Sequence, residues 1–310
     1  MYKTYVVFKL PGSFMAAWCA LDSAIGNRLR MAIVSSTAWP TGGVKYTMLK
    51  IITTLLLALS FSAFGAQQPP LPMDQCKVQA PYGFPTSAKQ STTKICREGY
   101  VLEYDENAKI PVWVSYVLTP EHVMGCFPRS NKFAADKSVR NPSVPKDYAK
   151  SNYDTGHIAN AEDMRWSFQA QEDSFILSNM TPQLPGFNRG VWKKLEDHVR
   201  VWDRARKNAL VVYAGPVYDV RQDSRIGRGG VTVPSAFYKI IVDTNTKEAM
   251  VFLFPHEPSS DDLETFMTSL AEVQKETGIV FPMPKGVKFS DAIWSTASRV
   301  TKKTCDLNPH

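Results

Sequence analysis

Residue types suited to acid–base and phosphate chemistry gather in a span of 47 residues, between Asp154 and Arg200. The candidates are one imidazole, two amides, a carboxylate and a guanidinium: His157, Asn179, Asn188, Glu196 and Arg200. A neutral imidazole accepts a proton near pH 7, and amide and carboxylate oxygens suit a hydrated Mg²⁺ ion. Arginine grips phosphate oxygens with two parallel hydrogen bonds. Because phosphodiester hydrolysis needs a base, a cation and help for the leaving oxygen, this set favours that reaction.

The same residues also have structural explanations. A lone histidine is usually structural, and Gly156 before His157 permits a close backbone approach at a bend or strand end. Asn188 precedes an apolar stripe of helical spacing, where asparagine commonly caps backbone N–H groups, so capping and metal ligation both stay open. That stripe consists of Val191, Leu195, Val199 and Trp202. Glu196 and Arg200 are four residues apart, a spacing that also gives an ordinary ion pair on a solvated helix.

Four sequence blocks occur in order along this stretch, and they include residues other than the catalytic candidates. They read D-T-G-H at 154–157, R-W-S at 165–167, S-N-M-T-P-Q at 178–183 and F-N-R-G-V-W-K-K-L-E at 187–196. In order and spacing they resemble the DNA/RNA non-specific endonucleases. These are the ββα-metal nucleases that include endonuclease G and secreted bacterial sugar-nonspecific nucleases. Four blocks at family spacing form a specific signal, so the resemblance implies a metal-dependent nuclease.

The resemblance also implies a role for each candidate. His157 matches the family's general base, and Asn188 matches its direct ligand to one Mg²⁺ ion, with Mn²⁺ as an alternative. Glu196 matches the glutamate that orients water at the metal. Asn179 matches an asparagine that positions the histidine or the phosphate, and Arg200 matches an arginine near the phosphate.

One position departs from the family pattern. The family's D-R-G-H block has an arginine where this chain has Thr155, and threonine provides no charged bidentate contact to phosphate. We expect Arg129 or Arg165 to compensate, and Arg189 to contribute to substrate binding as well. The wider basic run is either a local phosphate-binding surface or a solvated helix face; it comprises Arg189, Lys193, Lys194, Arg200, Arg204 and Arg206.

The first sixty-six residues are expected to be separate from the catalytic domain. Residues 48–66 combine Lys50, an apolar run from Ile51 to Phe64 and small residues up to Ala66, a pattern typical of a secretory signal peptide. A membrane anchor is the alternative, but the apolar run is shorter than the roughly 20 residues that a spanning helix needs. Residues 1–47 are either a genuine extension or sequence upstream of a true start at Met48. The protein is therefore expected to be secreted or periplasmic, with no stable membrane association after signal cleavage.

The formal net charge of +7 gives little information about the mature domain. Residues 1–66 hold six basic side chains and one acidic side chain, which leaves 30 basic and 28 acidic side chains, or +2, on residues 67–310. A high overall charge is therefore no argument for nucleic-acid binding here, and any phosphate-binding surface must be local.

Cysteine usage indicates an oxidising compartment. Cys19 lies in the leader, and an even number remains: Cys76, Cys96, Cys126 and Cys305. Of the three possible pairings, we favour Cys76–Cys96 as a local link and Cys126–Cys305 as a long-range link. A zinc site is the alternative, but no C-x-x-C or paired Cys/His spacing supports it.

The remaining chain alternates in a pattern typical of strands and ends with a helix. We expect strands at 99–104, 111–118, 210–218, 231–242 and 248–254, loops at 125–153 and 221–230, and a helix at 260–277. A single α+β domain over 67–310 follows, with a central antiparallel sheet flanked by helices. The resemblance covers about residues 95–285 and implies the ββα-metal (His-Me finger) nuclease fold.

Three functional hypotheses follow. The leading one is a secreted endonuclease that cleaves DNA and RNA, its two substrates. The second, motivated by Thr155, is a catalytically weak or inactive nucleic-acid-binding protein on the same scaffold. A nuclease toxin with a dedicated inhibitor is the third, but no receptor-binding or translocation region supports it. The sequence is compatible with a monomer or a homodimer.

Overall fold

The computed structural model describes residues 18–20, 30–32 and 67–295. The chain divides into two units, residues 1–66 and 67–310. In the first unit, β1 (Trp18–Ala20) pairs antiparallel with β2 (Arg30–Ala32). The predicted signal peptide lies outside the described residues. No helix of the described part of the chain is long and apolar enough to cross a bilayer.

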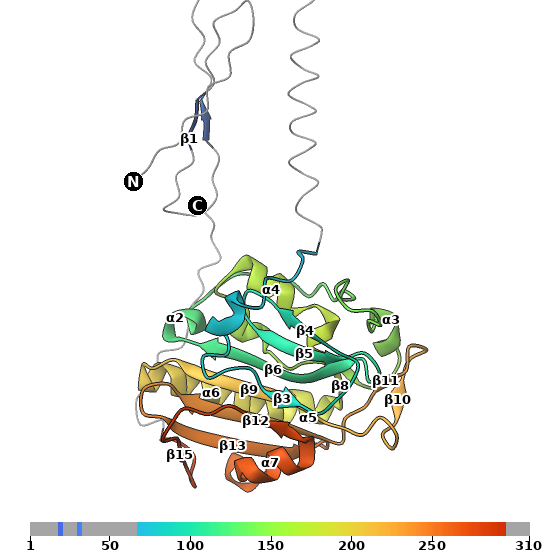
Figure 1. Cartoon of the computed structure of the whole chain (residues 1–310), viewed down its shortest axis with the longest axis vertical. Helices are drawn as coiled ribbons and strands as arrows, with labels where there is room; N and C mark the ends of the chain where they lie inside the picture. Colours follow the sequence, from blue (N-terminus) through green and yellow to red (C-terminus); the bar gives the residue numbers. More distant parts are fainter. Residues whose placement is uncertain (1–17, 21–29, 33–66, 296–310) are drawn as a thin grey trace, which may run out of the picture. The chain divides into compact units, whose positions relative to one another are not determined.

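A seven-stranded sheet forms the centre of the second unit (Figure 1). From edge to edge its strands are β15 (Lys288–Phe289), β13 (Glu248–Pro255), β12 (Ala236–Asp243), β9 (Leu210–Val217), β6 (Ile110–Leu118), β5 (Val101–Asp105) and β4 (Thr92–Cys96). Neighbouring strands run antiparallel except β13 and β15, which are parallel. The predicted antiparallel sheet is therefore correct for six strands and wrong at the β15 edge.

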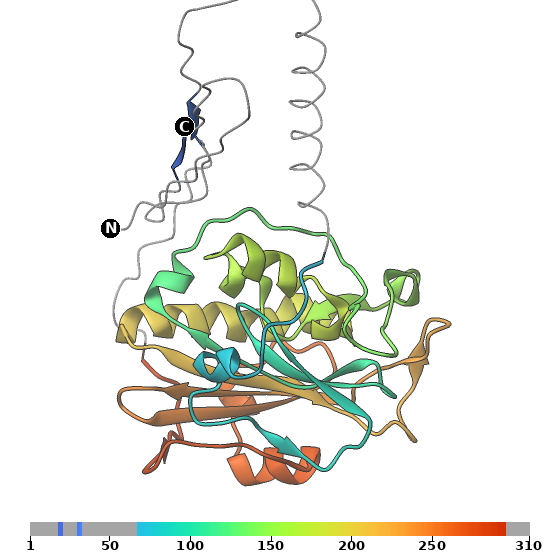
Figure 2. The ribbon, with the colours of Figure 1, turned by 45° about the horizontal axis from the view of Figure 1, so that its top comes forward.

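Both faces of the sheet are covered, which explains why its central strands are apolar almost without interruption. Along β9, Leu210 and Val212 face one core, while Val211 and Tyr213 face the other, as strand geometry requires. Helix α6 (Lys193–Arg206) packs on the first face. Helix α7 (Leu270–Thr277) and the 3₁₀ turn η1 (Gln75–Val78) cover the second face, on the side of the sheet opposite α6 (Figure 2).

Shorter elements connect these layers. They are β3 (Thr86–Ser87), α2 (Pro120–Val123), α3 (Pro145–Tyr148), β7 (Asp154–His157), η2 (Ala161–Met164), α4 (Phe168–Ser174), η3 (Leu177–Asn179), β8 (Met180–Gln183), α5 (Pro185–Phe187), η4 (Asn188–Trp192), β10 (Arg225–Ile226), β11 (Val231–Thr232), η5 (Leu263–Phe266) and β14 (Ile279–Val280). Strand β14 pairs with β3 outside the main sheet.

The expected helix at 260–277 is wrong over its first half. The chain forms η5 and then an extended step before α7, because the backbone N–H of Thr268 donates to Val251 O on β13 at 2.9 Å. Ser269 then caps α7 by accepting a hydrogen bond from the N–H of Glu272. A contact with a distant strand therefore overrides the local helical pattern.

Two further boundaries differ from expectation. The segment predicted as a loop at 221–230 contains β10, which pairs with β11 as a small hairpin. The predicted strand at 231–242 is consequently split into β11 and β12, and Pro234 lies in the break.

The described cysteines agree with the first predicted pairing. Cys76 and Cys96 form a disulfide with Cα atoms 5.7 Å apart, which links η1 to the edge strand β4. The second pairing involves Cys305, which lies outside the described residues, and it stays a prediction.

Candidate active site

Two strands and a helical segment form the frame of the site. Strand β7 pairs antiparallel with β8, and α5, η4 and α6 follow β8 directly in the chain. Gly156 lies opposite Thr181, and an added Cβ there would lie 2.1 Å from the side chain of Gln183. The predicted close backbone approach before His157 is therefore confirmed.

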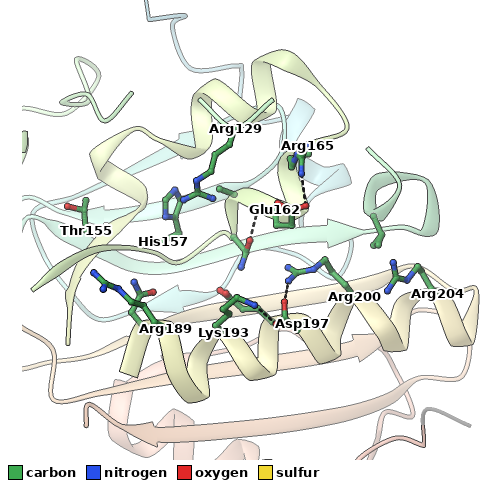
Figure 3. Close-up of a pocket in the computed structure, with 15 residues that line it drawn as sticks. Arg129, Thr155, His157, Glu162, Arg165, Arg189, Lys193, Asp197, Arg200 and Arg204 are labelled. Carbon is green, nitrogen blue, oxygen red and sulfur yellow. Dashed lines mark hydrogen bonds and ion pairs between the residues drawn. The ribbon is translucent and has the colours of Figure 1, made fainter. Parts of the chain in front are cut away.

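A cleft of about 780 Å³ lies between this frame and the segments that carry Arg129 and Glu162 (Figure 3). It is lined by seven of the eight predicted site residues: Arg129, His157, Arg165, Asn188, Arg189, Glu196 and Arg200. Thr155, Glu162, Lys193, Asp197 and Arg204 also contribute to the lining. Most of the residues predicted to be catalytic or substrate-binding therefore line one cleft.

The ring of His157 packs against two phenylalanine rings. Its ring centroid lies 4.8 Å from that of Phe175 and 5.8 Å from that of Phe133. Burial and the neighbouring charge of Arg129 lower the pKa of His157 to about 3. The imidazole is therefore neutral near pH 7, and its buried Nε2 has no hydrogen-bond partner among the described residues. A neutral ring with an uncommitted nitrogen is the form that accepts a proton.

Asn179 lies beneath the cleft rather than in its lining. Its side chain is fully buried, and Oδ1 accepts the backbone N–H of Ala159 at 2.8 Å. Nδ2 donates to the carbonyl oxygens of Ala159 and Ser174. These three hydrogen bonds fix the backbone just after His157, and they leave no side-chain donor free for a phosphate.

Asn188 is not a helix cap. A short helical turn already starts at Pro185, so Asn188 has helical backbone angles; it lies in η4, before a kink at Gly190, whose φ of −97° and ψ of −115° are non-helical. The capping explanation is therefore wrong. Its Nδ2 donates to Oδ2 of Asp154 at 2.9 Å, which fixes the amide and leaves Oδ1 as its acceptor in the cleft.

The donor set fits a hard divalent ion that keeps most of its water. Asn188 offers an amide oxygen and Glu196 offers a carboxylate in the same cleft. Within residues 67–295 and the two short strands before them, no group of three or more His, Cys, Asp or Glu residues forms a cage. Mg²⁺ requires few protein ligands, so this sparse arrangement is compatible with it.

Glu196 belongs to a buried charge pair. Its carboxylate lies 3.5 Å from Nζ of Lys239, whose side chain is completely buried and lies 4.1 Å from the Trp192 ring centroid. Burial raises the pKa of Glu196 and lowers that of Lys239, while the charge of each opposes the shift of the other. The alternative explanation, an i,i+4 ion pair of Glu196 with Arg200 on a solvated helix, is therefore wrong, because Glu196 is buried and Arg200 pairs with other carboxylates.

Arg200 is anchored by two acids. Its Nη1 donates to Oδ1 of Asp163 at 2.8 Å, and its Nη2 donates to Asp197. Asp163 is buried and accepts a further hydrogen bond from Tyr116 Oη. Although burial opposes it, Asp163 raises the pKa of Arg200, so the guanidinium is a fixed positive charge in the cleft.

The three arginines considered for substrate binding have different environments. Arg129 lies over the Phe175 ring, 4.9 Å from its centroid, on the same ring that supports His157. Arg165 donates to the carbonyl oxygen of Phe127 and pairs with Glu162. Arg189 donates two hydrogen bonds to the carboxylate of Asp154, the residue before Thr155 in sequence. Arg189 and Thr155 both line the cleft (Figure 3).

The sequence analysis did not identify three residues that position the site side chains. Asp154 accepts a hydrogen bond from Asn188, Asp163 accepts one from Arg200, and Lys239 pairs with Glu196. Lys239 gave a visible signal, since a lysine inside the apolar run F-Y-K-I-I-V needs a buried counter-charge. Asp154 and Asp163 gave none, because their partners lie more than thirty residues away in sequence.

The basic run on the helical segment has two sides. Lys194 pairs with Asp262, and Arg206 pairs with Asp243 and Glu248, away from the cleft lining. Arg189, Lys193, Arg200 and Arg204 line the cleft. The solvated-face explanation is therefore correct for part of the run only.

Three of the remaining histidines make structural contacts. His122 stacks on Trp166, and His198 bonds the carbonyl oxygen of Lys194. His256 bonds Pro234 O and accepts the N–H of Leu184. His310 lies outside the described residues.

Comparison with known proteins identifies the family of this chain. The sequence model of DNA/RNA non-specific endonucleases matches residues 79–286. Human mitochondrial endonuclease G is 32% identical over 219 residues, which cover 65% of this chain and 72% of that protein. The nuclease of Serratia marcescens is 29% identical over 235 residues, covering 73% and 86% respectively.

A solved structure is also similar. A chain in the crystal structure of the EndoG/EndoGI complex, which concerns the mechanism of EndoG inhibition, superposes with a TM-score of 0.60. The two chains are 30% identical, and the superposition covers 68% of this chain and 91% of that one.

Proposed function

Because this chain belongs to the DNA/RNA non-specific endonuclease family, with its ββα-metal fold, it is a phosphodiester-hydrolysing nuclease, and we propose that it cleaves both DNA and RNA in a divalent-metal-dependent reaction. The observation that carries this proposal is the shared cleft. His157, Asn188 and Glu196 line the same cavity although they come from a strand, a π-helical turn and an α-helix.

In the proposed reaction, His157 accepts the proton of the attacking water. Its ring is neutral and its Nε2 is uncommitted, as this task requires. The negative phosphate of a bound substrate would raise the pKa of His157 from its low free value, which makes the ring a stronger base when the substrate is present. Asn179 is a positioning residue that fixes the backbone beyond the histidine.

Charge on the substrate would be balanced by fixed cations. Arg129 lies beside His157, and Arg200 is held in place by Asp163 and Asp197. Prepositioned cations stabilise developing negative charge without reorganisation during the reaction.

Asn188 would hold the divalent ion, and Glu196 would orient water beside it. A bound Mg²⁺ or Mn²⁺ ion supplies a concentrated positive charge to the phosphate oxygens. The residue roles derive from the donor chemistry in the cleft and from the family resemblance.

We further propose that the mature domain is exported after cleavage near Ala66. The charged and apolar pattern of residues 48–66 and the Cys76–Cys96 disulfide support an oxidising compartment. Relatives of this chain include proteins named as mitochondrial, so export has to be tested separately. N-terminal sequencing of the protein recovered from periplasm or medium tests it, and full-length protein in the cytoplasm would contradict it.

Digestion of plasmid DNA and of RNA by the purified domain tests the activity. Nicking of DNA and degradation of RNA are expected with Mg²⁺, and neither is expected with EDTA or with the His157→Ala variant. Cleavage of one polymer alone would contradict the proposed dual specificity. Cleavage that persists in EDTA would contradict the metal dependence.

A further inference from the structure

Some of the cationic side chains that line the cleft form ion pairs with carboxylates, and others do not. Four are paired with carboxylates: Arg165 with Glu162, Arg189 with Asp154, Lys193 with Asp197, and Arg200 with Asp163 and Asp197. Within the described part of the chain, the other two lining cations, Arg129 and Arg204, have no carboxylate partner. Arg129 donates instead to the amide oxygen of Asn131. Carboxylates act on these two cations only at longer range, Glu162 and Glu196 on Arg129 and Asp203 on Arg204. The cleft therefore presents two positive charges that no contact ion pair neutralises among the described residues.

Arg204 is the less explained of the two. It lies on the cleft side of α6, one turn beyond Arg200 (Figure 3). Its Nε is buried, and among the described residues Arg204 forms no hydrogen bond or ion pair. An arginine with a structural role normally donates this N–H to a carbonyl or carboxylate, and leaving it unpaired is costly. An anion entering the cleft would remove that cost.

Arg204 lies beyond Arg200 on the helix and is distant from Glu196, where the proposed metal ion would lie. It lies eight residues after Glu196, which corresponds to about 12 Å along the helix axis. Successive nucleotides of a B-form strand rise about 3.4 Å, so this distance spans roughly three nucleotides. A phosphate at Arg204 therefore belongs to a different nucleotide from one beside His157.

We propose that Arg204 forms a second phosphate subsite, which binds the backbone of the same nucleic-acid strand several nucleotides from the bond that is cut. The proposal rests on the proposed nuclease function and extends it from one phosphate to a defined length of strand. Arg129 serves the phosphate next to His157, and Arg204 serves the distant one. Substrates too short to reach Arg204 gain nothing from it.

Comparison of a long and a minimal substrate tests the subsite. The long substrate is a fluorescein-labelled single strand of about 16 nucleotides, prepared as DNA and as RNA. The minimal one is bis(p-nitrophenyl) phosphate, which has a single phosphodiester. Arg204→Ala should lower kcat/KM on the strand about 3- to 10-fold and leave it unchanged on the small diester. Arg204→Lys should recover part of the loss. Equal effects on both substrates, or none on the strand, would overturn the proposal.

Binding in EDTA separates this subsite from catalysis. Fluorescence anisotropy of the same strand should show weaker binding to Arg204→Ala. The slope of log Kd plotted against the logarithm of the salt concentration should decrease by about 0.7 to 0.9, the value for one lost phosphate contact. This readout remains valid if no cleavage occurs at all, so the two proposals fail separately.

Arg221→Ala is the matched control. It also removes one arginine charge, but that side chain is 84% exposed and does not line the cleft. It should change neither the anisotropy titration nor its salt dependence. An equal effect of both variants would mean that general charge, rather than a subsite, governs binding, and would refute the proposal.

Discussion

Lys239 Nζ lies 3.5 Å from Oε1 of Glu196, and this contact joins strand β12 of the central sheet to helix α6. Both side chains are shielded from solvent, and Glu196 alone reaches the cleft lining. The lysine thus holds the carboxylate that the proposed reaction requires, and together with Arg200 it opposes the rise in the pKa of Glu196 that burial causes.

Replacing Lys239 with methionine should lower kcat/KM about 10- to 100-fold, since partners that orient reactive groups contribute effects of this size. It should also raise the pKa of Glu196 further, because the opposing positive charge is lost. The acidic limb of the pH–rate profile should therefore move to higher pH.

A double-mutant cycle with Glu196→Gln provides the control. Lys239→Met leaves a buried unpaired carboxyl and should destabilise the fold, whereas the double variant should recover part of that loss in Tm without recovering activity. Additive losses in rate would contradict the idea that Lys239 acts through Glu196.

His157→Ala should reduce cleavage at least about 100-fold while the Tm stays close to that of the parent protein. The ring contributes a proton acceptor to the reaction, and its packing on Phe175 is a modest part of the core. A variant that retains most of its plasmid-nicking rate would remove His157 from the role of base.

Acid stability should also depend on His157. Its pKa is lowered from 6.5 to about 3, so between these values the unfolded chain binds a proton that the folded protein excludes. The free energy of unfolding therefore falls as pH decreases through this window. His157→Gln removes this contribution, and calorimetry should show a smaller decrease in its Tm between pH 7 and pH 4. Parallel Tm curves for the two proteins would contradict the low pKa.

Asn188→Ala should lower Mg²⁺-dependent activity at least about 100-fold, because the proposed ligand oxygen is lost. Asp154→Ala should have a smaller effect, about tenfold, since it releases the Asn188 amide without removing it. Electron paramagnetic resonance of added Mn²⁺ measures binding independently of cleavage. Unchanged Mn²⁺ affinity in Asn188→Ala would show that the ion binds elsewhere.

Asp203→Asn should stabilise the protein above neutral pH. Asp203 is fully buried, and its carboxylate oxygens have no hydrogen-bond partner among residues 67–295. Burial and neighbouring acids, Asp163 first, raise its pKa to about 8 from 3.8. The folded state therefore holds a proton that the unfolded state has released, and stability falls as pH rises from about 4 to 8.

The gain for Asp203→Asn should be largest at pH 8 and small at pH 4, with roughly 2–4 °C in Tm for each kcal/mol. Asp219→Asn is a suitable comparison, because Asp219 has ordinary surface contacts with Arg221 and Gln222. A Tm gain that does not depend on pH would exclude ionisation of Asp203 as its cause.

The cleft residues were predictable because local sequence blocks carry them. The glycine before His157 indicates a strand end with a close neighbour, and the apolar stripe through Leu195 indicates the helix that carries Glu196 and Arg200. The supporting contacts were not predictable in the same way. Arg200 donates to Asp163, and the N–H of Thr268 donates to Val251 O, across long separations in sequence. These contacts form only in the folded chain, so the local sequence around each residue does not predict its partner.

The capping explanation for Asn188, one of the two left open, fails for the same reason. The apolar spacing alone predicts a helix start near Val191, which gives the asparagine before it the position of a cap. The earlier start at Pro185 and the π-helical turn depend on how α5 packs, including Phe187 stacked on Phe237 of β12.

The backbone break at Gly190 divides the helical segment that carries both proposed metal-site residues. Gly190 has non-helical angles, φ −97° and ψ −115°, so Asn188 precedes a kink and Glu196 follows it. The direction of the amide relative to the carboxylate is therefore set at this one residue and not by regular helix winding. Deleting Gly190 would reorient the two groups with respect to each other, and the proposed ion would lose its pair of neighbouring oxygen donors.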